Sequence, residues 1–244
     1  MIKITNLTKI YGDLTVLDNI SLDIPDGKTL AVIGTSGCGK STLLRLILAL
    51  EEPTKGTIAI DGKVISRLSE EGLVKIRKMI GMVFQSSALF DSMSVFENIA
   101  FPLREHLKLS ETEISRIVNS KLDMVELSGK GNLMPSELSG GMQKRVSIAR
   151  ALANDPKIIL YDEPTTGLDP ITSTTIENLI NKLAAGLKVT SIIVTHQLST
   201  IFRTAHRIIM LDKGKFIDSG TVDETKKSNN PVVYKFINAE KEGI

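Results

Sequence analysis

Two short stretches of the sequence carry residues suited to phosphate chemistry. The first, GTSGCGKST at residues 34–42, fits the pattern G-x-x-x-x-G-K-[ST]. In such a loop the backbone N–H groups point into one concavity, the lysine reaches the β- and γ-phosphates, and the hydroxyl after it holds Mg²⁺. We therefore predict a phosphate-binding loop (P-loop) made of Gly34, Thr35, Ser36, Gly37, Cys38, Gly39, Lys40, Ser41 and Thr42.

The second stretch is the acidic pair Asp162–Glu163, which follows the apolar run at residues 158–161. A strand of that length would deliver both carboxylates to its carboxyl end, the edge at which open α/β sheets bind ligands. Asp162 is then placed to complete the coordination of Mg²⁺, and Glu163 to reach a water beside the γ-phosphate. Acids also end strands that have no function, but the P-loop earlier in the chain argues against that alternative here.

The residues around these stretches predict the elements that position them. An apolar run at 30–33 predicts a strand before the P-loop, and residues 43–48 predict a helix after it. Further strands are predicted at 80–84, 158–161 and 190–194, with a helix between the last two that begins at Asp169–Pro170. This alternation is typical of a parallel sheet. The apolar stripe of that helix is predicted to be Ile176, Leu179, Ile180, Leu183 and Leu187.

Other segments predict additions to this core. Strands at 2–7, 20–24 and 57–61, the last ending in the hairpin signal Asp61–Gly62, indicate an antiparallel subdomain. Two short strands are expected within 207–219. We predict a single α/β domain with a P-loop core and β-subdomain at residues 1–85 and 157–220, an inserted helical subdomain at 86–156, and a helical tail at 221–244.

Composition narrows the possible partners and environment. Thirty Lys and Arg residues against 28 Asp and Glu residues give a net charge of +2, which argues against a protein that coats nucleic acid. Cys38 is the only cysteine, so a disulfide within the chain is impossible. Residues 1–5 lack the apolar core of a signal peptide, and no stretch approaches the roughly 20 apolar residues of a membrane span. Any membrane association is therefore expected to run through another protein.

With Leu138-Ser139-Gly140-Gly141-Met142, the chain resembles the ATP-binding subunit of ABC transporters over nearly its whole length. The motifs match in order. They are Tyr11 where the family stacks adenine, the Walker A loop Gly34–Thr42, Gln85 of the Q-loop, the signature Ser139-Gly140-Gly141, Walker B Asp162 with the catalytic Glu163, the D-loop Gly167-Leu168-Asp169 and the switch histidine His196.

The resemblance implies that ATP is the substrate and Mg²⁺ the cofactor of phosphoryl transfer to water. Glu163 would activate the water, Lys40 would neutralise charge, and His196 and Gln85 would lie on the γ-phosphate side. The implied metal ligands are Ser41, Gln85 and Asp162, and Asp169 joins the nucleotide-binding residues. His106 and His206 are expected to have no such role.

The signature Ser139-Gly140-Gly141 opens a helix, so it forms an anion site without a lysine of its own. In the family it completes the P-loop site of a second subunit. We therefore expect two copies of the chain to form a head-to-tail dimer around two ATP molecules. Plainer alternatives are that Ser139 is an ordinary N-cap, His196 a core histidine and Tyr11 an exposed aromatic residue of a turn.

The segment after Gln85 is rich in phenylalanine, and in the family this region faces the membrane permease. We expect contact near Ser86–Met93, with Leu89, Phe90 and Met93 in an interface groove, and with Phe96 and Phe101 in the core. The amino-acid sequence of this segment, together with Met142 in the signature, resembles that of the Mla/Mce-type branch of the family. That branch powers phospholipid or other lipid movement at the cytoplasmic face of the bacterial inner membrane, with lipid-binding envelope components as indirect partners.

Several alternatives stay open. The cargo could be an amino acid or a metal complex. A non-transport ABC ATPase acting on DNA or ribosomes would need coiled-coil or zinc insertions or a second cassette, for which 244 residues leave no room. A regulatory module without turnover is disfavoured by Glu163 and His196. Gln197 departs from the Asp that usually follows the switch histidine, and Cys38 predicts sensitivity to thiol reagents.

Overall fold

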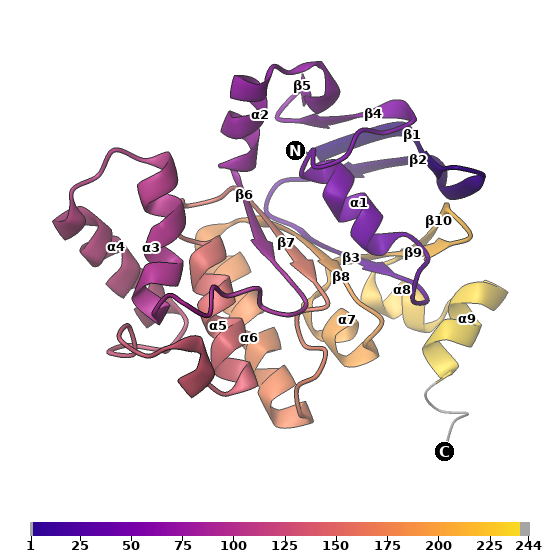
Figure 1. Cartoon of the computed structure of the whole chain (residues 1–244). Helices are drawn as coiled ribbons and strands as arrows, with labels where there is room; N and C mark the ends of the chain where they lie inside the picture. Colours follow the sequence, from indigo (N-terminus) through magenta and orange to yellow (C-terminus); the bar gives the residue numbers. More distant parts are fainter. Residues whose placement is uncertain (1, 240–244) are drawn as a thin grey trace.

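The computed structural model describes residues 2–239, which form two β-sheets and the helices that cover them (Figure 1). The larger sheet has the strand order β10-β9-β3-β8-β7-β6. Its strands are β3 (Thr29–Ile33), β6 (Ile80–Val83), β7 (Ile158–Asp162), β8 (Thr190–Val194), β9 (Arg207–Asp212) and β10 (Lys215–Gly220). Strands β3, β6, β7, β8 and β9 run parallel to one another, and β10 pairs with β9 antiparallel. The predicted parallel P-loop sheet is therefore confirmed.

The smaller sheet is antiparallel and has the order β2-β1-β4-β5. It contains β1 (Ile2–Tyr11), β2 (Leu14–Ile24), β4 (Lys55–Ile60) and β5 (Lys63–Val64). Asp61 and Gly62 have φ of 47° and 76°, the left-handed pair that a two-residue hairpin turn requires. Strands β1 and β2 are longer than predicted, because their pairing continues through register shifts where the polar and apolar alternation breaks.

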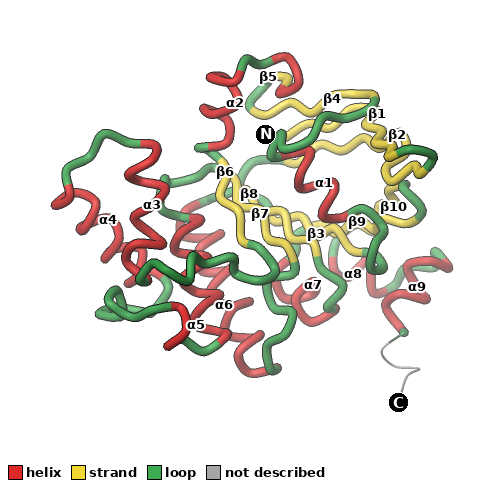
Figure 2. The backbone as a smooth tube through the Cα atoms, viewed as in Figure 1, coloured by secondary structure: helices red, strands yellow, loops and turns green. Residues whose placement is uncertain are grey.

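Alternate residues of the parallel strands point to two different cores. In β7, for example, Ile158 and Leu160 pack toward the antiparallel sheet and helix α1 (Lys40–Ile47), while Ile159 and Tyr161 pack toward the helices on the other face. Figure 2 shows α1 between the two sheets, with α5 (Gly140–Ala151) and α6 (Pro170–Leu187) on the opposite side of the large sheet. Both faces of the sheet are thus covered, as parallel sheets require.

The remaining helices surround this core. They are α2 (Glu70–Arg77), α3 (Val95–His106), α4 (Glu111–Met124), α7 (Leu198–Thr204), α8 (Val222–Lys226) and α9 (Pro231–Asn238), with short 3₁₀ turns at Ile65–Arg67 and Pro135–Glu137. Helices α3 and α4 lie to one side of the sheets in Figure 1. Ser110 and Glu113 form a capping box at the start of α4, and the helix predicted to begin at Asp169–Pro170 has Asp169 as its N-cap.

Two details of the helices concern earlier expectations. Along α6 the predicted stripe is buried from Ile176 to Leu183, but Leu187 is 40% exposed, because it lies in the last turn beyond the edge of the sheet. Within residues 2–239, none of the helices has the length and apolar character needed to cross a bilayer. The predicted tail at 221–244 contains α8 and α9, and its part at 240–244 lies outside the described residues.

Candidate active site

The strand order brings the predicted motifs to one edge of the large sheet. The P-loop follows β3, His196 comes shortly after β8, Glu163 follows β7 and Gln85 comes shortly after β6, and these four strands are consecutive neighbours. The register is equally close, since Val194 pairs with both Val32 and Asp162. Because the strands are parallel, their carboxyl ends meet at this edge. Residues more than 150 positions apart in the chain (40 to 196) therefore meet at one surface.

The P-loop has the backbone shape that the motif needs. Gly34, Gly37 and Gly39 have φ of 154°, 78° and 109°, and Gly39 is the N-cap of α1. A Cβ at Gly34 would lie 2.4 Å from the carbonyl oxygen of Leu211 and 2.7 Å from Cys38 Sγ, so only glycine fits there. The start of α1 adds its N–H groups and positive dipole end to this concavity. Thr35, Ser36 and Ser41 remain exposed, and Thr42 is buried beneath them.

Lys40 is 7% exposed and lies inside the loop. Its Nζ donates hydrogen bonds to the carbonyl oxygens of Gly34, at 2.8 Å, and Thr35, at 3.0 Å. A buried ammonium whose closest acceptors are neutral carbonyl oxygens is a cation that an anion at this position would satisfy. The P-loop therefore fits a phosphate group.

Ser41 and Asp162 meet across the site, with Ser41 Oγ 3.3 Å from Asp162 Oδ1. Burial raises the pKa of Asp162, and the neighbouring charge of Glu163 adds to this effect. One hydroxyl and one carboxylate suit Mg²⁺, which takes one or two carboxylates plus substrate phosphates and water. Residues 2–239 contain no group of three or more His, Cys, Asp and Glu side chains placed to hold a metal.

Glu163 is the most tightly held of the predicted catalytic side chains. Its Oε2 accepts hydrogen bonds from Thr195 Oγ1, at 2.8 Å, and Thr166 Oγ1, at 3.0 Å. Its Oε1 lies 2.9 Å from His196 Nδ1. The backbone at Glu163 is left-handed, with φ of 47°, and its N–H donates to the carbonyl of Val194. A non-glycine residue in this conformation is a form of strain that surrounding contacts sustain at functional sites.

The signature residues open α5 beside the D-loop. Ser139 is the N-cap of the helix and accepts from the N–H of Met142 at 3.3 Å. A Cβ at Gly140 would touch Leu168, and one at Gly141 would lie 2.5 Å from Thr172 Cγ2. These glycines therefore allow α5 to start close against the beginning of α6, while Ser139 and Gly140 stay exposed.

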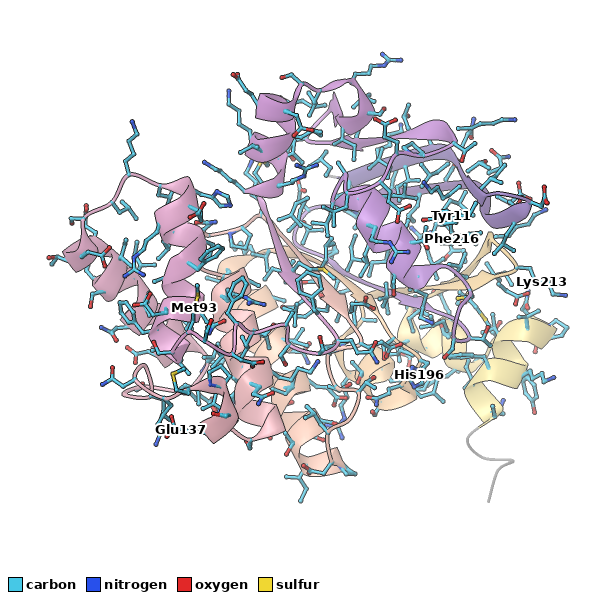
Figure 3. The ribbon with its side chains drawn as sticks, viewed as in Figure 1. Tyr11, Met93, Glu137, His196, Lys213 and Phe216 are labelled. Atoms are coloured by element: carbon cyan, nitrogen blue, oxygen red, sulfur yellow. The ribbon has the colours of Figure 1, made fainter. Side chains whose placement is uncertain are left out.

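Tyr11 and Gln85 lie at the margins of the site. The Tyr11 ring is 40% exposed, Lys9 Nζ lies 4.7 Å from its centroid, and its hydroxyl bonds Glu51. Figure 3 shows Tyr11 on the side of the antiparallel sheet and His196 near α7. The Gln85 side chain is exposed, and its carbonyl accepts a hydrogen bond from Lys144.

Sequence reasoning missed residues that hold the site from behind. Lys144, in α5, is buried and donates to the carbonyl oxygens of Phe84 and Gln85. Burial lowers the pKa of Lys144 to about 8, although Asp162 and Glu163 act in the opposite direction. Thr195 was also missed, although its position at the end of β8, directly before His196, was a usable signal. No spacing in the sequence indicates the partner of Lys144.

A groove of about 470 Å³ lies beside the site, between β6, α3 and α5. Its aromatic lining consists of Phe84, Phe90 and Phe101, with the rings of Phe90 and Phe101 5.1 Å apart. The expectation that Phe101 is a core residue is wrong: it is 37% exposed, because Ile99, Ala100 and Leu103 occupy the inner face of α3.

The other expectations for this segment have mixed outcomes. Phe96 packs against the helical core as expected. Leu89 also packs against that core and does not line the groove, which corrects its predicted place, and Met93 lies outside the lining as well. Arg150 donates to the carbonyls of Ser87 and Ala88, which have φ of 62° and 47°. The loop after Gln85 is therefore fixed in shape from α5.

A larger cavity, of about 780 Å³, lies at the opposite edge of the sheet, where β3 and β9 begin. Three of its charged side chains have partners within the protein: Arg207 pairs with Asp218, and Glu224 caps α8. His206 Nδ1 accepts a hydrogen bond from the backbone N–H of Thr29 at 3.1 Å, which joins the starts of β9 and β3. This cavity therefore lacks the convergent reactive groups of the P-loop edge.

The Cys38 thiol gives a prediction about thiol reagents. Burial raises its pKa, and the nearby Lys40 charge only partly opposes this. Because the thiolate is the reactive form, iodoacetamide should label Cys38 more slowly than a free cysteine near pH 7 and faster toward about pH 9. ATP should slow labelling further, since Cys38 Sγ lies 4.0 Å from Lys40 Nζ. Mass spectrometry of labelling time courses checks this; equal rates with and without ATP would contradict it.

The fold and the site together define a P-loop nucleoside triphosphatase with an added antiparallel sheet and a helical insertion. Comparison with known proteins is more specific. A family profile described as "ABC transporter" matches residues 17–166, and the chain belongs to this family. It is an ATP-binding subunit with ATPase activity.

Three relatives illustrate the similarity. The Haemophilus influenzae "Intermembrane phospholipid transport system ATP-binding protein MlaF" is 44% identical over 243 residues, covering 100% of this chain and 92% of that one. The "Methionine import ATP-binding protein MetN" of the same species is 43% identical over 228 residues, covering 92% and 66%. A solved dimeric ATP-binding cassette in a post-hydrolysis state, bound to ADP and Pi, has a TM-score of 0.83 at 38% identity, covering 91% and 99%.

Proposed function

We propose that the chain is the Mg²⁺-dependent motor subunit of a phospholipid transporter of the bacterial inner membrane. The observation that carries the cargo is coverage: the similarity extends over 92% of the phospholipid transport relative but only 66% of the methionine import relative. The methionine relative supports the second candidate, an importer for an amino acid. The transport reaction itself would depend on a permease, because the described helices include none that could cross a membrane.

In this proposal ATP is the substrate of the P-loop edge. The P-loop amides and Lys40 bind the phosphates, Ser41 and Asp162 hold Mg²⁺ with Gln85 alongside, and Tyr11 stacks on adenine. Mg²⁺ would supply charge neutralisation at the phosphates. The Glu163 carboxylate orients the attacking water and accepts its proton. His196 Nδ1, 2.9 Å from Glu163, fixes the orientation of that carboxylate, while its other ring nitrogen is available to the γ-phosphate side.

The signature supports a head-to-tail dimer. Ser139, Gly140 and Gly141 present helix N–H groups without a lysine, so they would complete the P-loop site of a second copy, with Asp169 at the junction. The solved relative of similar fold is dimeric and holds ADP and Pi. Two sites of this kind would require both copies to close before hydrolysis.

The aromatic groove beside Gln85 is the surface we assign to the permease. It carries three partly exposed phenylalanines and the fixed loop Ser86–Met93, and Lys144 and Arg150 join it rigidly to the signature helix. A movement of α5 would therefore be transmitted to a permease segment bound in this groove. Lipid-binding envelope components would be indirect partners, connected to this protein through the permease.

Replacing Phe90 by Asp tests this assignment. The change should weaken permease association by about 30-fold, the loss expected for an aromatic residue at the centre of an interface. Leu107→Asp is the matched control, because Leu107 is 41% exposed at the end of α3 and outside the groove. The measurement is recovery of the permease with tagged protein from detergent-solubilised membranes. Equal recovery of both variants would contradict the groove.

The cargo is tested on the complex recovered in this way. Mass spectrometry of its bound small molecules should identify phospholipid, and its ATPase rate in vesicles should depend on the phospholipid supplied. Stimulation by an amino acid without any response to phospholipid would instead select the importer for an amino acid.

A further inference from the structure

A chain of side-chain contacts runs from the loop after Glu163 to the protein surface at α7. The side-chain oxygen Oε1 of Gln197 faces Thr165 Oγ1, which lies 2.7 Å from Thr200 Oγ1. Thr200 Oγ1 lies 2.8 Å from Glu177 Oε1, and Arg203 Nε lies 3.2 Å from Glu177 Oε2. Both threonines are fully buried and Glu177 is 1% exposed. This chain of hydrogen-bonding side chains has no part in the binding of ATP described above.

The number of protons fixes the direction of these hydrogen bonds. Each threonine hydroxyl has one proton to donate, and the Glu177 carboxylate, ion-paired with Arg203, has no proton and can only accept. Thr200 must therefore donate to Glu177. Thr165 must then donate to Thr200, since the 2.7 Å contact would otherwise set two lone pairs against each other. Thr165 has no proton left for Gln197.

The amide of Gln197 must consequently donate to Thr165. The oxygen and nitrogen of a Gln side chain are assigned from their hydrogen-bond partners. Here the partners require the two atoms to be exchanged, so that Nε2 instead of Oε1 lies against Thr165. The direction is then Gln197 to Thr165 to Thr200 to Glu177, and every contact holds one proton. A carboxylate at position 197 could not take this place, because it has no proton to donate.

We propose that Gln197 is a positioning residue whose amide N–H begins this one-way chain and thereby holds the loops that carry Glu163 and His196. The backbone N–H of Gln197 also donates to Thr195 Oγ1 at 3.1 Å, and Thr195 donates to Glu163. Gln197 thus ties the His196 loop to both the carboxylate and the segment after it. The proposal rests on the roles proposed above for Glu163 and His196.

The direction of this hydrogen-bond chain predicts how substitutions at its two ends, Gln197 and Glu177, combine. In Gln197→Asp the side chains at both ends of the hydrogen-bond chain can only accept. The two threonine protons must then serve three contacts, so one contact is left without a proton. The substitution also adds a second negative charge to a buried network. With Glu177→Gln the chain keeps its direction, because the new side-chain oxygen still accepts from Thr200. In the double variant Glu177→Gln/Gln197→Asp the direction reverses, since the amide at 177 donates and the carboxylate at 197 accepts.

Five proteins test the proposal: wild type, Gln197→Asp, Gln197→Asn, Glu177→Gln and the double variant. Asn and Asp have the same length and differ only in the donor. We expect Gln197→Asp to lower kcat by about tenfold with KM for ATP changed less than about twofold, and to lower the thermal unfolding midpoint of the nucleotide-free protein. Gln197→Asn and Glu177→Gln should retain most of the activity, and the double variant should recover most of what Gln197→Asp loses.

Asn181→Ala is the control for a purely structural tether. Asn181 Nδ2 donates to the carbonyl of Arg203 at 2.9 Å, so it also joins α6 to α7, but it has no branch toward Glu163. This variant should lower the unfolding midpoint and leave kcat unchanged. The unfolding measurements need no ATP, so they test the chain of hydrogen bonds even if Glu163 proves not to be the catalytic base.

If the variants fold, three outcomes would overturn the proposal. Equal losses in Gln197→Asp and Gln197→Asn would show that length, not the donor, matters. Additive losses in the double variant would show that positions 177 and 197 are not coupled. Changes confined to the unfolding midpoint, with kcat unaltered throughout, would remove the positioning role. If Gln197→Asp does not fold, a folded and active double variant supports the chain, and failure of both variants overturns it.

Discussion

Replacing Glu163 by Gln is expected to lower the rate of ATP hydrolysis by about 10²- to 10⁴-fold, the contribution of a positioned general base. Gln has the same size but cannot accept the proton of water. ATP binding should survive, because the P-loop contacts of Lys40 do not involve Glu163. The effect on kcat should therefore far exceed the effect on KM.

The steady-state release of phosphate, together with the affinity for ATP, checks this expectation. Glu105→Gln, which alters an exposed carboxylate on α3, is the matched control and should hydrolyse ATP at the wild-type rate. A rate close to wild type for Glu163→Gln would sink the assignment of Glu163 as the base. The shape of the carboxylate site makes an indirect effect small, since Thr195 and Thr166 can still donate to the remaining oxygen.

The P-loop and its partners were predictable because their geometry is local. Gly34, Gly37 and Gly39 take positive φ within one short loop, and Asp162 reaches the site because a short apolar strand ends there. The parallel pairing of the strands then follows from the alternation of strands and helices. The fold class and most strands and helices could therefore be predicted from the sequence.

The groove and the buried network were not predictable in the same way. Phe101 lies in the groove because the inner face of α3 is set by packing against α4 and α5, which no local pattern specifies. Leu89 packs against the helical core and does not line the groove. The contacts of Gln197 join residues that are 32 to 35 positions apart on separate elements. In the sequence, Gln197 is only a departure from a usual Asp, and the buried Glu177 that accounts for it gives no signal of its own.

Lys40→Met is expected to affect binding where Glu163→Gln affects turnover. Removing one partner of a buried charge pair costs about 2 kcal/mol or more, which corresponds to a loss of roughly 30-fold in affinity for ATP. Met keeps the length and the apolar stem of lysine, so the P-loop should keep its shape. The carbonyls of Gly34 and Thr35 lose their donor, which should lower the free energy of unfolding by about 1 to 3 kcal/mol.

Isothermal titration with ATP and thermal unfolding measure the two effects separately. Lys108→Met, at an exposed lysine after α3, is the control and should change neither. An unchanged affinity for ATP in Lys40→Met would contradict the P-loop assignment. The pair of variants also separates the two halves of the mechanism: Lys40→Met should bind ATP weakly and so fail to form the closed dimer, whereas Glu163→Gln should bind ATP and accumulate in that dimer. Opposite oligomeric states in the presence of ATP would therefore place binding before closure, and closure before hydrolysis.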